Sequence, residues 1–203
     1  MRFVYIHGFA SSPQSRKAQA FEAAMAERGL RLEIPAMDGG DFKHLTISGQ
    51  LLLLERTLDG APACLIGSSM GGYLAALYAS MNPEVERMVL MAPAFGFAPR
   101  WKEKVAEGAD LEVYHYGDKT TRRVHYGLIQ DALRFPANPD FRQPALVFHG
   151  IHDDVVPVGY SRNVAALHPN VRLVEFESDH ELLDVLPRII REGLDFLAEN
   201  YAA

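Results

Sequence analysis

Short apolar runs rich in β-branched residues alternate along the chain with segments whose apolar residues recur at helical spacing. Six such runs predict strands, at residues 2–6, 30–34, 63–67, 87–92, 145–150 and 171–176. Most of the segments between them have the periodicity of amphipathic helices. This alternation predicts an α/β fold, in which helices cover both faces of a mostly parallel sheet.

Four helices are marked clearly by their start and stop signals. They are expected at about residues 12–29, 45–60, 71–81 and 181–200. In the first, Ser12 is a suitable N-cap, Pro13 suits the first helical position and Gly29 the stop. In the last, Pro187 interrupts an apolar stripe at helical spacing.

One interval breaks the regular alternation. Residues 95–140 are about twice as long as a simple crossover between two strands needs. Within them, "LEVYHYGDKTTRRVHYG" predicts a hairpin that turns at Gly117-Asp118 and is followed by a helix. We expect a small lid insertion in a single domain that spans residues 1–203.

Composition limits the classes of function. The chain has 203 residues, of which 48% are hydrophobic and 23% charged, as in an ordinary globular domain. Its net charge of −6 gives no support for nucleic acid as a partner, since phosphate binding needs clustered Lys and Arg. The apolar run near the N-terminus is too short for a membrane span, and the single cysteine, Cys64, favours a cytoplasmic location.

The stretch "LIGSSMGGYLAAL" carries the strongest chemical signal. Gly67-Ser68-Ser69-Met70-Gly71 matches G-x-S-x-G between a predicted strand and a predicted helix, the context of a nucleophile elbow. Such an elbow is a sharp turn, so the residues two before and two after the nucleophile must be small. Ser69 is therefore the expected nucleophile and Ser68 a spacer; the alternative is a plain glycine turn.

A serine hydroxyl needs a base, and the base needs an acid that orients it. The loop after residues 145–150 offers Asp153 and Asp154, and the loop after 171–176 offers His180. Because parallel strands end at one edge of a sheet, these loops should lie beside Ser69. Either aspartate could reach the histidine, although spacing favours Asp153; His152 is the rival base.

The remaining ionisable candidates have simpler interpretations. His7, His44, His115, His125 and His168 are expected in turns, in the lid or on the surface, and His149 at a strand end. Asp179 and Asp184 are expected as helix-start and surface charges. The histidines and carboxylates show no metal-ligand spacing such as H-E-x-x-H, and we expect neither a metal nor another cofactor.

Taken together, "YIHGFASSP", "GSSMGG", "HGIHDDVVP" and "SDH" resemble the α/β-hydrolase superfamily over essentially the whole chain. Within it the sequence is similar to small YqiA-like esterases and to the acyl-protein thioesterase type. The resemblance implies a trimmed α/β-hydrolase fold with a mostly parallel sheet of about six strands. It assigns the acid position to Asp153 and the base position to His180.

The resemblance also implies an oxyanion hole built from the backbone N–H groups of Phe9 and Met70. The expected reaction is cleavage of a small-molecule carboxylic ester or thioester through an acyl-enzyme on Ser69. A perhydrolase, a haloperoxidase or a C–C bond hydrolase of the same fold is the alternative, and a non-catalytic binding protein a further one. Lid aromatics such as Trp101 could line an acyl pocket or simply pack the lid. Acyl length and oligomeric state are left open.

The choice between the two aspartates can be tested directly. Asp153→Asn should lower turnover by orders of magnitude, because an amide would hold the wrong tautomer of the imidazole. Asp154→Asn should leave turnover nearly unchanged. Steady-state kinetics on a short p-nitrophenyl ester measures both, and the reverse order of effects would move the acid role to Asp154.

Overall fold

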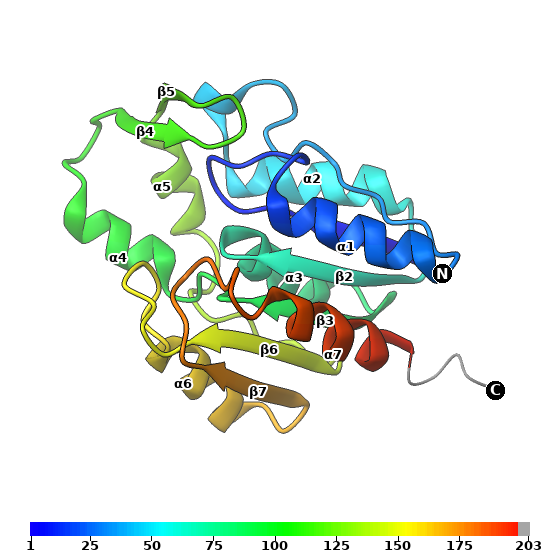
Figure 1. The fold of residues 1–203 in the computed structure, drawn as a ribbon. Coiled ribbons are helices and arrows are strands. Elements are labelled where there is room, and N and C mark those ends of the chain that lie inside the picture. Colours follow the sequence, from blue (N-terminus) through cyan, green and yellow to red (C-terminus); the bar gives the residue numbers. More distant parts are fainter. Residues whose placement is uncertain (199–203) are drawn as a thin grey trace.

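The computed structural model describes residues 1–198, which form a sheet covered by helices (Figure 1). Five parallel strands form its sheet in the order β1-β2-β3-β6-β7. They are β1 (Arg2–Ile6), β2 (Ala63–Ser68), β3 (Val85–Met91), β6 (Ala145–Gly150) and β7 (Val171–Phe176). All five strands run the same way, so their carboxyl ends meet at one edge of the sheet. The predicted fold class is confirmed.

Helices cover both faces of the sheet (Figure 1). One face carries α1 (Arg16–Glu27) and α7 (Leu186–Ala198); the other carries α2 (Ile47–Leu58), α3 (Met70–Met81) and α6 (Gly159–Leu167). A separate cluster of buried apolar side chains fills each of the two layers. The central strands β2 and β6 are buried at every position, as expected for a sheet covered on both sides.

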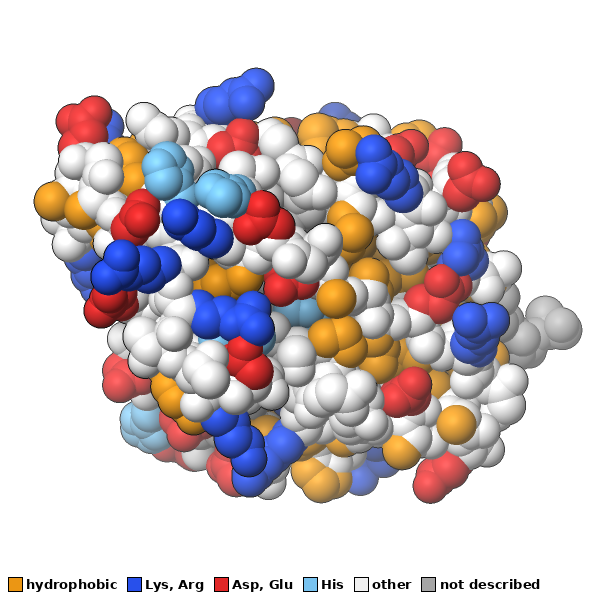
Figure 2. Space-filling model, turned by 90° about the horizontal axis from the view of Figure 1, so that it is seen from above, with side chains coloured by type: hydrophobic (Ala, Val, Ile, Leu, Met, Phe, Trp, Pro, Cys, Tyr) orange, Lys and Arg blue, Asp and Glu red, His pale blue; other side chains and the backbone are white. Residues whose placement is uncertain are grey.

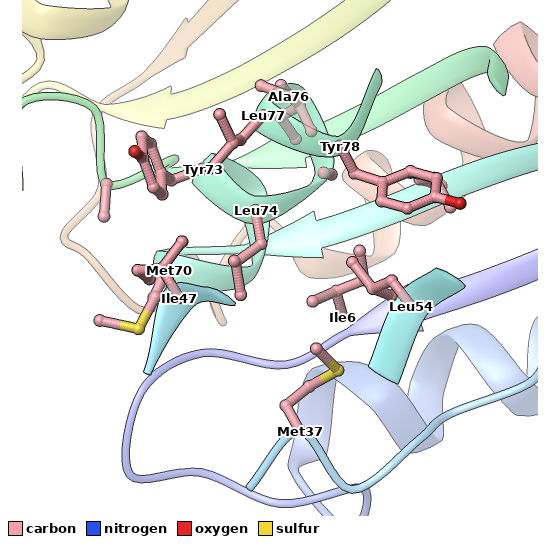
Figure 3. Close-up of a cluster of buried hydrophobic side chains, with 14 of the residues drawn as sticks. Ile6, Met37, Ile47, Leu54, Met70, Tyr73, Leu74, Ala76, Leu77 and Tyr78 are labelled. Atoms are coloured by element: carbon pink, nitrogen blue, oxygen red, sulfur yellow. The ribbon is translucent and has the colours of Figure 1, made fainter. Parts of the chain in front are cut away.

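Buried contacts around α3 hold the middle of the domain together (Figure 3). Leu74 of α3, Ile6 of β1 and Leu54 of α2 belong to one cluster and are fully buried. Ten residues of α3 are buried, so this helix is apolar nearly all round. The position of α3 against the sheet is therefore determined by close packing on every side.

The helix boundaries differ from the prediction in two places. The prediction that Ser12 caps the first helix is wrong: Ser15 does so, and its hydroxyl accepts a hydrogen bond from the N–H of Ala18. Ser12 instead lies in a turn that the N–H of Ser15 closes on the Ser12 carbonyl at 3.0 Å. Pro187 does not interrupt the last helix, because it is the second residue of α7, where its missing N–H has no intrahelical partner to lose.

The expected strand at residues 30–34 is reduced to a single β-bridge between Val4 and Glu33. The N–H of Tyr5 donates to Glu33 and the N–H of Glu33 donates to Phe3, at 2.8 and 2.9 Å. Pro35 follows two residues later and has no N–H to continue a ladder. The bridge therefore adds only one paired residue beyond the edge strand β1.

Residues 95–140 form two helices and a β-hairpin at the carboxyl edge of the sheet (Figure 1). Its elements are α4 (Phe97–Lys104), β4 (Leu111–His115), β5 (Thr120–Val124) and α5 (Gly127–Ala132). The strands β4 and β5 form an antiparallel hairpin, and its turn includes Gly117-Asp118, as the sequence predicts. A lid function for this segment stays a prediction.

Charged side chains gather over the end of the molecule that carries β4, β5 and the short helix η1 (Phe42–His44) (Figure 2). Basic groups here have acidic partners: Arg123 lies 3.0 Å from Glu112, and His44 lies 2.8 Å from Asp41. Surface ion pairs of this kind are solvated and contribute little stability. The positive charges of Arg122 and Arg123 in β5 thus lie beside the carboxylates of Asp118 and Glu112.

Across residues 1–198, the helices are all too short or too polar to pass through a lipid bilayer.

Two leucines of α2 provide a matched test of the core. Leu54 is fully buried against α3, whereas Leu52 on the same helix is 51% exposed. Leu54→Ala should lower the free energy of unfolding by about 2–5 kcal/mol, because it removes buried methyl groups and leaves a cavity. Leu52→Ala should change it by less than about 0.5 kcal/mol. Urea unfolding followed by circular dichroism measures both, and equal losses would contradict the described packing.

Candidate active site

Ser69 occupies a strained turn between β2 and α3. Its backbone has φ 54° and ψ −118°, a region that residues other than glycine rarely adopt. Backbone hydrogen bonds hold it there: the Ser69 N–H donates to the carbonyl of Met91, and the Ser69 carbonyl accepts from the N–H of Ala94, both at 2.9 Å. The strain is thus held by the neighbouring strand β3 and the residues that follow it.

The turn depends on two glycines. A Cβ on Gly71 would lie 2.0 Å from the carbonyl oxygen of Ile6, and one on Gly67 would lie 2.5 Å from that of Gly71. Both obstacles are backbone atoms, which cannot move aside as a flexible side chain could. The small residues that the motif requires are therefore explained by close approach between α3, β1 and β2.

The structure brings the three predicted side chains together at the carboxyl edge. Nε2 of His180 lies 3.1 Å from Oγ of Ser69, and Nδ1 of His180 lies 2.7 Å from Oδ2 of Asp153. Ser69 follows β2, Asp153 follows β6 and His180 follows β7. Their order along the chain and their contacts form a serine–histidine–aspartate arrangement, called the candidate triad below.

Asp153 is held as a carboxylate by four donors. Oδ1 accepts from the N–H groups of Val155 and Val156 at 2.9 and 2.7 Å, while Oδ2 faces His180 and His149 at 2.7 and 3.1 Å. Burial alone would raise the pKa of Asp153. Hydrogen bonds from His149, His180 and Val156 outweigh it and hold the pKa well below its usual range.

The loop that carries His180 is itself braced. Oδ1 of Asp179 accepts from the N–H groups of Glu181 and Leu182 at 2.9 and 3.2 Å. A Cβ on Gly150, at the end of β6, would lie 2.3 Å from the carbonyl oxygen of Ser178, so the loop packs directly on that strand end. Asp179 thus shapes the turn of this loop. The prediction that it starts a helix is wrong, because the last helix begins at Leu186.

The rival candidates lie away from Ser69. His152 is exposed, and its Nε2 pairs with Oε2 of Glu177 at 2.8 Å. Asp154 is exposed, in contrast to Asp153, whose side chain is fully buried. Among the described residues, only His180 forms a hydrogen bond with the hydroxyl of Ser69.

The loop after β1, which carries the predicted oxyanion donor Phe9, lies beside Ser69. A Cβ on Gly8 would be 3.4 Å from Cβ of Ser69, which places the loop after β1 next to the elbow. Within residues 1–198, no hydrogen bond uses the backbone N–H of Phe9 or Met70. Met70 also begins α3, where the helix dipole favours negative charge. Both amides are therefore available for an oxyanion.

His7 supports this loop from behind. Its Nδ1–H donates to the carbonyl of Gly8 at 3.0 Å, and its Nε2 accepts from the N–H of Met37 at 3.1 Å. Burial lowers the pKa of His7, which favours the neutral ring that this bonding pattern requires. His7 is thus a packing residue that orients the loop, in keeping with its expected place in a turn.

Aromatic side chains surround Phe9. Its ring lies 5.6 Å from that of Phe42 and 5.1 Å, edge to face, from that of Trp101 in α4. Two further aromatic residues of the segment 95–140 differ in exposure: Phe97 is buried with its ring 5.9 Å from that of Trp101, whereas Tyr116 is 69% exposed. Trp101 is thus an aromatic side chain of residues 95–140 that contacts the ring of Phe9.

Sequence reasoning missed two residues of this site. His149 was expected only to end a strand, yet its ring contacts Oδ2 of Asp153 and the hydroxyl of Ser161. Its place four residues before the acid was a possible signal, but nothing in the spacing reveals the Ser161 contact. The described residues contain no cluster of three or more His, Cys, Asp or Glu that could hold a metal ion; the absence of a cofactor stays a prediction.

Comparison with solved structures agrees on the fold. Est1E from Butyrivibrio proteoclasticus with bound ferulic acid has TM-score 0.81 and 19% identity, and covers 97% of this chain and 89% of its own. Alpha/beta hydrolase domain-containing protein 10 from mouse has TM-score 0.82 and 21% identity, with the same coverages. A monoacylglycerol lipase from Paleococcus ferrophilus has TM-score 0.76 and 16% identity, with coverages of 96% and 93%.

These similarities define the class: the chain has the α/β-hydrolase fold, as its motifs predict. Its sequence matches the Uncharacterised protein family (UPF0227) over residues 2–197, and the chain belongs to that family. Comparison with curated protein sequences gave no match.

The depressed pKa of Asp153 predicts a pH dependence of stability. A carboxyl with a lowered folded-state pKa stabilises the folded state above its unfolded value of about 3.9, and this contribution is lost as pH falls through the folded value. The difference in unfolding free energy between wild type and Asp153→Asn should thus stay constant from about pH 7 to 5 and shrink below about pH 4. Urea unfolding at several pH values measures it. A difference that already shrinks between pH 7 and 5 would contradict a carboxylate with a lowered pKa.

Proposed function

We propose that this protein is a serine hydrolase that cleaves carboxylic esters or thioesters of small molecules. The observation that carries the proposal is the chain of contacts from Ser69 through His180 to Asp153, at 3.1 and 2.7 Å. A strained serine at the start of a helix, with a histidine on its hydroxyl, suits nucleophilic attack on a carbonyl. A binding protein on the same scaffold would have no need of this alignment.

In the first step, Oγ of Ser69 attacks the carbonyl carbon while Nε2 of His180 takes the hydroxyl proton. Asp153 holds Nδ1–H of His180 and stabilises the imidazolium that forms. His180 then gives the proton to the leaving alcohol or thiol, and the acyl group stays on Ser69. In the second step, His180 takes a proton from water as the water attacks the acyl carbon; the bond between that carbon and Oγ of Ser69 then breaks, His180 returns the proton to Oγ, and the carboxylic acid leaves.

The tetrahedral intermediate of each step carries a negative oxygen. The backbone N–H groups of Phe9 and Met70 are the donors that would stabilise it, since neither has another hydrogen-bond partner among the described residues. The residues on both sides of Phe9 are held: the Gly8 carbonyl accepts from Nδ1–H of His7 at 3.0 Å, and the Ala10 carbonyl accepts from the N–H of Tyr116 at 2.7 Å. This support keeps the donors preorganised before a substrate arrives.

The segment 95–140 would act as the lid of this site. Nη1 of Arg100, in α4, donates to the carbonyl of Val155 at 2.9 Å, which joins the segment to the loop of Asp153. Tyr116 joins it to the loop of Phe9. A lid tied to both loops would exclude water from the acyl-enzyme and present Trp101 to the acyl group.

The proposal that the cleaved bond is an ester is supported by the names of two structural neighbours. One neighbour is a monoacylglycerol lipase, and another was solved with ferulic acid bound. An ester or thioester is the substrate class that fits a triad with an oxyanion hole. A cytoplasmic location stays a prediction from the single Cys64.

A fluorophosphonate probe tests the nucleophile without knowledge of the substrate. Wild type and Ser68→Ala should be labelled, because Ser68 is a buried residue at the end of β2. Ser69→Ala should not be labelled, since it lacks the only hydroxyl on His180 in the described structure. Labelling is read by in-gel fluorescence and by mass spectrometry of the peptide.

Labelling that persists in Ser69→Ala would remove Ser69 from the mechanism. Assays of wild type on short p-nitrophenyl esters and on acyl thioesters then define the bond that is cleaved. Formation of peracids without ester cleavage would favour the perhydrolase alternative.

A further inference from the structure

A second histidine lies on the far side of the triad carboxylate. His149, at the end of β6, is fully buried, and its Nε2 lies 3.1 Å from Oδ2 of Asp153 and 2.9 Å from the carbonyl oxygen of Val156. Its Nδ1 lies 2.8 Å from Oγ of Ser161 in α6, which is 1% exposed. The contacts on Ser69, His180 and Asp153 thus continue inward to two further buried groups.

The bonding partners define which nitrogen of the neutral ring carries the hydrogen. The carbonyl of Val156 and the carboxylate of Asp153 can only accept hydrogen bonds, so Nε2 of His149 must carry a hydrogen. A neutral ring then has a lone pair on Nδ1, which accepts from the hydroxyl of Ser161. In the other neutral tautomer, the lone pair of Nε2 would face the carboxylate of Asp153 and the carbonyl of Val156. This repulsion between buried acceptors is strongly unfavourable.

We propose that Ser161 and His149 are positioning residues of the candidate triad. The hydroxyl of Ser161 holds His149 in the Nε2–H tautomer, and that N–H fixes Oδ2 of Asp153 where it faces Nδ1 of His180. This inference deepens the proposed function and rests on it. Neither residue touches the reacting atoms; both act through Asp153.

The fold makes this arrangement rigid. Oδ1 of Asp153 is already occupied by the N–H groups of Val155 and Val156, so Oδ2 alone is shared between the two histidines. His149 lies near the carboxyl end of β6, and Ser161 is in α6, which packs beside β7. The orientation of the carboxylate is therefore determined by β6, by its following loop and by α6 together.

Loss of the Ser161 hydroxyl has a specific consequence. Without a donor on Nδ1, the proton of neutral His149 can move from Nε2 to Nδ1. The carboxylate of Asp153 then loses a donor and faces a lone pair, so its alignment with His180 is disturbed. A purely structural role for Ser161 would predict lower stability with no change of tautomer.

The tautomer is measured by long-range ¹H–¹⁵N NMR on protein labelled with ¹⁵N-histidine. Wild-type His149, assigned by the loss of its signals in His149→Gln, should show the neutral Nε2–H form. Ser161→Ala should move it toward the Nδ1–H form. Ser80→Ala is the matched control, because it removes a hydroxyl that bonds only the carbonyl of Leu77 in α3, and it should leave the His149 signals in place.

The effect on the nucleophile is measured as the rate constant of fluorophosphonate labelling. In metal sites, removal of the hydrogen-bond partner behind a ligand typically costs ~10–100-fold in affinity or activity, and we expect an effect at the low end of this range here. Ser161→Ala should therefore be labelled about tenfold more slowly than wild type, and Ser80→Ala at the wild-type rate. Ser161→Cys, which keeps a weak donor, should fall between the two and serves if Ser161→Ala does not fold.

The outcomes separate the two proposals. A wild-type protein that the probe does not label would overturn the proposed function, whatever the NMR spectrum shows. Labelled wild type with His149 in the Nδ1–H or doubly protonated form would overturn the positioning roles alone. So would a Ser161→Ala variant with an unchanged tautomer and labelling rate.

Discussion

The site depends on one close approach, where the start of α3 passes against the end of β1. At Gly71 there is room for a hydrogen and for nothing larger, since an added Cβ would lie 2.0 Å from a backbone carbonyl of Ile6. This contact forces the sharp turn that gives Ser69 its positive φ of 54°. The same contact brings the loop of Gly8 and Phe9 beside the serine, so the nucleophile and the predicted oxyanion donors share one geometric cause.

The second requirement is a carboxylate that stays charged although it is buried. Such a group is costly unless its lone pairs are satisfied, and Asp153 has donors from two backbone N–H groups and two imidazoles. These donors come from the strand end at His149, the loop around Val156 and the loop of His180. Because each comes from a different segment of the carboxyl edge, the parallel sheet itself assembles this environment.

Much of this arrangement could be predicted from sequence because it follows from strand ends. Ser69, Asp153 and His180 each come just after a buried apolar run, and a parallel sheet collects such positions at one edge. Local capping was harder to predict: Ser12 and Ser15 are both suitable N-caps, and Ser15 caps the helix while Ser12 lies in the turn before it. The contact between His149 and Ser161 joins the end of β6 to the next helix along the chain, across the loop that carries Asp153, and no periodicity encodes it.

The central claim is that acyl groups pass through a covalent intermediate on Ser69. Rapid mixing with p-nitrophenyl acetate, followed by an acid quench and mass spectrometry, tests it most directly. The proposed mechanism predicts a burst of p-nitrophenol and one acetyl group per chain, carried by the peptide that contains Ser69. Turnover without any acetylated peptide, or acetylation of another residue at the rate of the burst, would contradict it.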